Sequence, residues 1–340
     1  MVRHFIAIVI LFGIVVGVLY GLVNTPLLTE YYVPRFIQSQ AKGLEVQSFK
    51  IGRQLFRFPD ILELYDVQGR VSSQGKDYVF TAQKLIVYDL QQFFQNRQQL
   101  RLYWEGLTGE SGDTRLNNLR AKVSLSWDQF IVTRIDGIFH GDGLSVLPYD
   151  LGEFTGRIKG NGQKIEIFEL ATKSYGGLAQ GQIQVEMVPQ CQYVLWLEYQ
   201  GIDAVKVRST GNLFFSQLAG TLQGSLRIVG NLGRVELLAM NFTMPQGGAL
   251  GSSLLKRMMG PIDDLETKAQ LETLLLSRDS FPVDSAVFAM RNAPGNKVVI
   301  DFNVNNKKEQ LQLKGSQEFH FDLSLKGIFH QPTKKSLQQQ

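Results

Sequence analysis

The sequence predicts a mainly β protein: an elongated, curved antiparallel sheet, preceded by an N-terminal transmembrane helix and interrupted by one or two short helices near residues 249–277. Apolar and polar residues alternate with a period of two over most of the chain, as in strands with one wetted face. The chain has 33 glycines against 10 prolines, and glycines stand where many alternating segments end. An uncharged apolar run lies close to the N-terminus.

The composition excludes several classes of protein. With 340 residues, 44% of them hydrophobic and 19% charged, the chain is too apolar for disorder and too polar for a multi-span membrane protein. A net charge of +4 without long Lys/Arg blocks predicts no nucleic-acid partner. A single cysteine, Cys191, excludes an internal disulfide and a Cys-based zinc site. The chain has only 4 histidines, so we expect neither an enzyme nor a cofactor or metal site.

Residues 5–23 carry no charge and predict a transmembrane anchor, since about 20 apolar residues cross a bilayer core. Arg3 and the terminal amine precede the run, so residues 1–4 form a cytoplasmic stub and the rest is exported. A cleaved signal peptide is the alternative, but Leu22–Pro26 offers no small-residue cleavage site. The expected organisation continues with an exported β-rich body at 24–330 and a disordered tail at 331–340.

Strict alternation defines the strands of the body, because successive side chains of a strand point to opposite faces. The run 193–197 is apolar throughout and predicts a strand that is covered on both faces. The clearest alternating segments are 100–105, 121–128, 182–187, 225–228, 298–304 and 318–326.

The helical insertion near 249–277 consists of two segments. From Ala249 to Met259 the apolar residues recur at helical spacing. A second helix is expected to begin near Pro261, a favourable first-turn residue, and to end near Ser277.

No catalytic motif is complete. Ser253 and Lys256 form an S-x-x-K pair, but its partner motifs are absent and the intervening leucines fit a packing stripe. His140, Asp142 and Asp136 could be read as a metal or acid–base cluster, yet a glycine-rich turn explains them better.

A long sheet with one apolar face must cover that face, and two short helices are too few. Either a second sheet closes a sandwich, or the sheet curls into an open trough that holds acyl chains. In an open trough, a charge at Leu226 or Phe321 would impair lipid binding and leave folding intact. The candidate groove residues on the apolar faces of well-patterned strands are Ile183, Val185, Leu226, Ile228, Phe319, Phe321 and Leu323.

Several segments resemble the AsmA-like family, the bacterial relatives of TamB, YhdP and YdbH. Residues 62–69 (LELYDVQG) and 80–90 (FTAQKLIVYDL) are similar to the chorein-like start of such proteins. Residues 174–181 (SYGGLAQG) resemble the family's glycine hairpin, and 201–203 with 218–226 resemble its C-terminal stretch. The insertion near 249–277 has no counterpart in that pattern.

The resemblance implies a taco-like sheet with a hydrophobic groove, on a single-pass bacterial inner-membrane protein whose body lies in the periplasm. It implies a role in lipid transport or outer-membrane biogenesis, with phospholipid and envelope proteins as partners. The alternative is a structural or assembly factor of the envelope without lipid transport, such as a secretion-system subunit of the type II protein-N kind.

Intact-mass analysis tests the anchor. Chain extracted from membranes should retain residues 5–23, because no cleavage site follows the run. A soluble mature form that begins near Thr25 would show that the run is a signal peptide.

Overall fold

The computed structural model describes residues 24–27, 29–31, 34–35, 44–73, 76–90, 99–112, 114–128, 131–146, 149–161, 163–186, 192–207, 214–231, 234–259, 265–275, 278–293 and 297–320. The predicted stub, the anchor at 5–23 and the tail at 331–340 lie outside these residues. The chain divides into two compact units, Met1–Phe139 and His140–Gln340. Each unit is described by itself.

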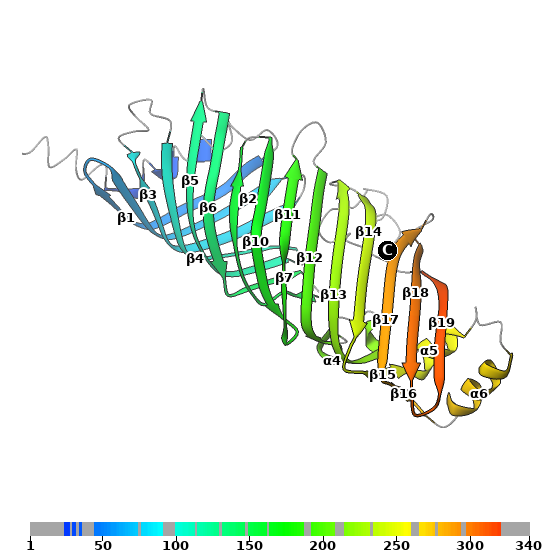
Figure 1. Cartoon of the computed structure of the whole chain (residues 1–340). Helices are drawn as coiled ribbons and strands as arrows, with labels where there is room; N and C mark the ends of the chain where they lie inside the picture. Colours follow the sequence, from blue (N-terminus) through cyan, green and yellow to red (C-terminus); the bar gives the residue numbers. More distant parts are fainter. Residues whose placement is uncertain are drawn as a thin grey trace, which may run out of the picture. The chain divides into compact units, whose positions relative to one another are not determined.

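Unit 1 is an antiparallel meander in which neighbours in the chain are neighbours in the sheet (Figure 1). Its strands are β1 (Leu44–Arg57), β2 (Ile61–Ser73), β3 (Lys76–Tyr88), β4 (Gln99–Ser111), β5 (Thr114–Asp128) and most of β6 (Ile131–Gly141).

The alternation of side chains shifts by one residue in the middle of β2. Leu64 and Val67 are both almost fully buried and belong to the same apolar cluster, although residues three apart in a regular strand face opposite sides. Asp66 between them has a left-handed backbone (φ 53°), which accounts for the shift. Gly52 lies opposite, where a Cβ would stand 2.9 Å from the Asp66 Cβ, so this position requires glycine.

The segment that precedes β1 is attached to it by two side chains. The Asn24 Oδ1 accepts a hydrogen bond from the Phe56 amide at 2.5 Å, and the Glu30 Oε1 accepts one from the Ile51 amide at 2.6 Å. As the chain runs from 24 to 30, its contacts run from 56 back to 51. Residues 24–30 therefore follow β1 in the opposite direction.

Unit 2 is a longer antiparallel meander in which β14 pairs with β17 across an inserted segment (Figure 1). Its main strands are β9 (Glu153–Gly160), β10 (Lys164–Ser174), β11 (Gly177–Glu186), β12 (Gln192–Asp203), β13 (Leu218–Asn231), β14 (Arg234–Met244), β17 (Ser285–Ala293), β18 (Lys297–Asn306) and β19 (Leu311–His320). The short strands β7 (Gly143–Val146) and β8 (Tyr149–Asp150) precede them.

The insertion contains β15 (Gly248–Gly251), α5 (Ser252–Met258), α6 (Leu265–Leu275) and β16 (Ser280–Val283), and Figure 1 shows it beside one end of β17–β19. The short helices α4 (Ala204–Val207) and η2 (Phe215–Gln217) join β12 to β13. Leu255 and Met258 of α5 and Leu271 of α6 are almost completely buried in the same core as the sheet residues Phe242 and Phe288. The insertion therefore covers part of the apolar face of the sheet.

Aromatic rings form the centre of this core. Phe242 of β14 and Phe288 of β17 are cross-strand partners and stack with their centroids 4.7 Å apart. Phe214, just before η2, meets both rings edge-on at 5.9 and 5.7 Å. Such pairs add about 0.5–1.5 kcal/mol beyond the burial of their area.

The structure confirms the mainly β fold, the antiparallel pairing and the two short helices near 249–277. Each predicted strand segment falls on a strand, although β11 is described only to Glu186 and β19 only to His320, so the ends of the segments 182–187 and 318–326 lie outside the described residues. One prediction is wrong: 193–197 is not covered on both faces. Trp196 is 38% exposed, because it lies between Gln182 and Arg227 on the polar face of the sheet.

Replacing Phe288 with alanine should lower the free energy of unfolding by about 3–5 kcal/mol, because it opens a cavity in a fully packed core. Its neighbour Val287 is 47% exposed on the opposite face, so Val287→Ala is the matched control and should cost little. Urea unfolding followed by tryptophan fluorescence measures both. Equal costs for the two variants would contradict this assignment of the core.

Candidate functional site

The apolar face of unit 2 carries rows of aliphatic side chains that run across neighbouring strands. Ile183 of β11 pairs with Leu195 of β12, which pairs with Ile228 of β13, which in turn pairs with Leu238 of β14. Partners in an antiparallel pair project to the same face, so these four residues form one row. The next row contains Leu197, Leu226, Met240, Met290 and Ile300.

Burial is uneven across this face. In β18 every second residue from Val298 to Asn306 is buried. In the row of Phe242 and Phe288, Tyr199 of β12 is also buried, and burial raises the pKa of its hydroxyl, which donates to the Asn241 carbonyl. By contrast, Ile183, Leu195 and Ile228 are only half-buried. One sheet face therefore has a closed zone and a partly exposed aliphatic zone, which we call the open zone: Ile183, Val185, Leu195, Leu226 and Ile228.

The structure brings four of the seven predicted groove residues together. Ile183, Val185, Leu226 and Ile228 lie on one face, and all four are half-buried. The Phe319 backbone pairs with buried Val298 at the far side of the sheet, and its side chain is outside the described part. Phe321 and Leu323 lie outside the described residues altogether.

The expectation that Leu226 tolerates a charge needs correction. Leu226 and Ile228 pack against the buried core, whereas Ile183 and Val185 do not belong to that cluster. A charge at Leu226 would therefore disturb the core directly. Ile183 is a groove candidate that can be changed without disturbing that core directly.

Sequence reasoning missed Leu195, which stands between Ile183 and Ile228 in the row. Its segment is apolar at every position, so alternation gave no indication of which of its residues lie on the same face as Ile183 and Ile228. Only the pairing register shows that Leu195 belongs there and Trp196 does not.

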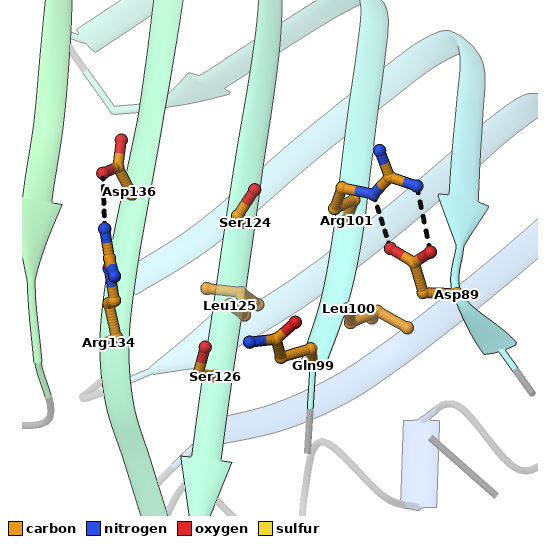
Figure 2. Close-up of a pocket in the computed structure, with 9 residues that line it drawn as sticks. All are labelled: Asp89, Gln99, Leu100, Arg101, Ser124, Leu125, Ser126, Arg134 and Asp136. Carbon is orange, nitrogen blue, oxygen red and sulfur yellow. Dashed lines mark hydrogen bonds and ion pairs between the residues drawn. The ribbon is translucent and has the colours of Figure 1, made fainter. Parts of the chain in front are cut away.

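A polar pocket lies within unit 1, between β4, β5 and β6 and the residue that follows β3 (Figure 2). Its volume is about 360 Å³, and Gln99, Ser124 and Ser126 contribute to its lining. Arg101 binds Asp89 through two nitrogens, at 2.5 and 2.9 Å, and this contact raises the pKa of Arg101. Arg134 lies 3.4 Å from Asp136. Both arginines that line the pocket therefore have a carboxylate partner.

The residues of the two incomplete motifs, the S-x-x-K pair and the His140 cluster, make other contacts in the structure. Ser253 donates a hydrogen bond to the Gln217 side chain at 2.6 Å. His140 lies 3.4 Å from Asp142 in unit 2, while Asp136 is paired with Arg134 in unit 1. Among the described residues, no group of three or more His, Cys, Asp or Glu could hold a metal ion.

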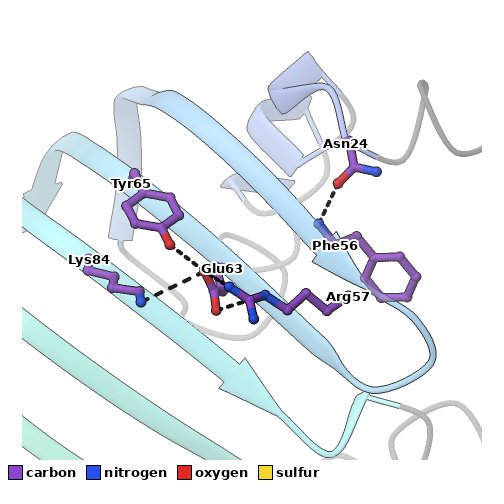
Figure 3. A network of polar contacts seen from close by, with 6 residues as sticks. All are labelled: Asn24, Phe56, Arg57, Glu63, Tyr65 and Lys84. Atoms are coloured by element: carbon purple, nitrogen blue, oxygen red, sulfur yellow. Dashed lines mark hydrogen bonds and ion pairs between the residues drawn. The ribbon is translucent and has the colours of Figure 1, made fainter.

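A buried carboxylate in unit 1, Glu63 of β2, is held by three side chains (Figure 3). The Tyr65 hydroxyl donates to Glu63, the Arg57 Nε lies 3.2 Å from it, and the Lys84 Nζ lies 3.7 Å from it. The hydrogen bond from Tyr65, helped by the charges of Lys84 and Arg57, lowers the pKa of Glu63 against the opposing effect of burial. Nothing in the alternation of the sequence indicated this network.

Comparison with known proteins gives no relative from which to transfer a role: no family model, no curated protein and no solved structure matches the chain. None of the helices in the described part of the chain has the length and apolar character needed to cross a bilayer. The predicted anchor at 5–23 precedes that part.

The Glu63 network predicts a pH dependence of stability. Because the folded state lowers the pKa of Glu63, its contribution is fully present above the ordinary carboxyl pKa and is lost as the pH falls through the lowered value. Glu63→Gln should therefore destabilise the chain near neutral pH, and the difference from the wild type should shrink in acid. Unfolding midpoints measured across pH check this. A difference that stays constant, or grows in acid, would contradict it.

Proposed function

We propose that this protein is a membrane-anchored protein of the bacterial cell envelope that holds lipid acyl chains against the apolar face of its sheet. The observation that carries the proposal is the half-buried aliphatic row Ile183–Leu195–Ile228, on the same face as a fully packed core. Aliphatic side chains left partly exposed in such a row provide a surface that favours an apolar ligand.

The chemistry of the open zone fits an acyl chain better than a polar ligand. Its side chains are aliphatic, and polar residues such as Gln182 and Arg227 alternate onto the opposite face. Burial of each methylene contributes about 0.8 kcal/mol without any directional contact, so ten methylenes could supply about 8 kcal/mol before the costs of binding. Strands lie about 4.8 Å apart, so the half-buried row from β11 to β13 is about 10 Å long.

The sequence supports the membrane part of the proposal. In this proposal residues 5–23 cross the inner membrane and the body lies in the periplasm, as positive Arg3 and the uncharged run favour. The resemblance to AsmA-like proteins favours a role in lipid transport or outer-membrane biogenesis.

A second candidate is an assembly factor of the envelope that carries no lipid. The observation that favours it is that Leu226 and Ile228 pack against the buried core, as residues of an ordinary core boundary do. An assembly factor would contain no bound lipid after purification.

Native mass spectrometry of the gently solubilised chain, with extraction and identification of co-purified lipid, separates the two candidates. The wild type should carry phospholipid. Ile183→Asp should lose it, because an ion in a water-poor apolar site costs several kcal/mol. Ile183 is outside the buried core, so the thermal midpoint should change little.

Gln182→Asp is the matched control, because Gln182 is exposed next to Ile183 and faces the other side of the sheet. It should retain lipid. A wild type without phospholipid would refute the lipid proposal, and a folded Ile183→Asp chain that still carries lipid would refute this face as its site.

A further inference from the structure

Unit 1 exposes large apolar side chains close to the point where the chain enters from the predicted anchor. Phe58 is 83% exposed, Leu27 is 71% exposed and Tyr31 is 53% exposed. An isolated exposed aromatic needs no explanation, but these three lie on two segments that the structure joins. We call them, together with Arg35, the entry patch.

Phe58 stands at the tip of the β1–β2 hairpin. Arg57 to Asp60 form a tight turn, in which the Asp60 amide donates to the Arg57 carbonyl at 3.1 Å. The Phe58 ring meets the Phe56 ring edge-on, with 6.4 Å between the ring centroids. Burial of a phenylalanine side chain is favourable by about 1.5–3 kcal/mol relative to exposure in water. The exposed Phe58 side chain therefore favours contact with an apolar environment.

The hydrogen bond between Asn24 and Phe56 brings this tip to the start of the described chain (Figure 3). Asn24 directly follows the apolar run 5–23, and Phe58 is two residues beyond Phe56. Two residues of extended chain span at most about 7 Å, so the tip lies within about 15 Å of the end of the run. The headgroup region is about 5–8 Å thick on each side of the hydrocarbon core.

The other members of the patch have the chemistry of the membrane interface. Leu27, Tyr31 and Arg35 follow one another at intervals of four residues in the sequence. The Arg35 guanidinium lies 3.4 Å from the centre of the Tyr31 ring. Aromatic rings favour the headgroup level, and arginine reaches lipid phosphates from there.

We infer that the entry patch is a membrane-docking surface: the Phe58 tip and Leu27 insert into the leaflet on the side of the body, with Tyr31 and Arg35 at the headgroups. This rests on the anchor of the proposed function and goes beyond it, because it fixes which end of unit 1 lies on the lipid. The opposite end of β2, near Tyr78, would then stand about 30 Å from the surface along the strand.

The test uses the full chain in nanodiscs of phosphatidylethanolamine and phosphatidylglycerol, with or without bromine on the acyl chains. Phe58→Trp and Leu27→Trp place a fluorophore in the patch. Tyr78→Trp is the matched control, because Tyr78 is 43% exposed in the same unit, on β3 opposite Val71 near the far end of β2. The wild type supplies the background of its 3 native tryptophans.

Emission added by Trp at 58 or 27 should be shifted to the blue and quenched about twofold or more by brominated lipid, as expected for rings that are inserted into the leaflet. Emission added at 78 should be unaffected. Unquenched emission from position 58 in chain that is held in the discs would overturn the docking surface and leave the anchor intact. Equal quenching at 58 and 78 would also overturn it. A chain recovered outside the discs would overturn the anchor itself and this inference with it.

Discussion

The apolar face of the unit 2 sheet requires cover, and the chain supplies that cover unevenly. The insertion between β14 and β17 and the segment before β13 pack Leu255, Leu271 and Phe214 onto the sheet, around the stacked pair Phe242 and Phe288. Toward β11 the same face continues with aliphatic residues but is only half-buried at Ile183 and Leu195. Because burial of apolar area is the main source of stability, the covered zone contributes most to the stability of unit 2, whereas the open zone stays partly exposed.

The sequence predicted the individual strands and helices better than the pairing register between strands. The alternation in 298–304 correctly indicated which side of β18 is buried, and the helical spacing of Leu254, Leu255 and Met258 indicated α5. Period two does not reveal where the phase shifts, because Asp66 in β2 and Glu169 in β10 interrupt it with a left-handed residue. Nor does it reveal the register, on which the row of Ile183, Leu195 and Ile228 depends. The apolar face of each strand could therefore be predicted from the sequence. The surface that these faces form together could not, because it depends on the register.

Two carboxylates of unit 1, Asp89 and Glu63, are surrounded by side chains that pair with them. Asp89 holds Arg101 through both of its oxygens, and Glu63 has Tyr65, Arg57 and Lys84 around it. The hydrogen bond from Tyr65 and the charges of Lys84 and Arg57 lower the pKa of Glu63, which favours its ionised form. These contacts join neighbouring strands of unit 1.

The side chains that attach residues 24–30 to β1 also affect how the chain meets other copies of itself. A strand with free amides along its margin is a template on which a second chain can add a strand, and this is a common route to aggregation. Here Asn24 and Glu30 occupy the amides of Phe56 and Ile51, and the segment that carries them lies along the strand. An incoming strand would have to displace it before pairing. The segment that carries Asn24 and Glu30 therefore hinders the addition of a further strand at β1. Proteolysis that removed this segment would expose the backbone amides of the β1 edge and favour aggregation.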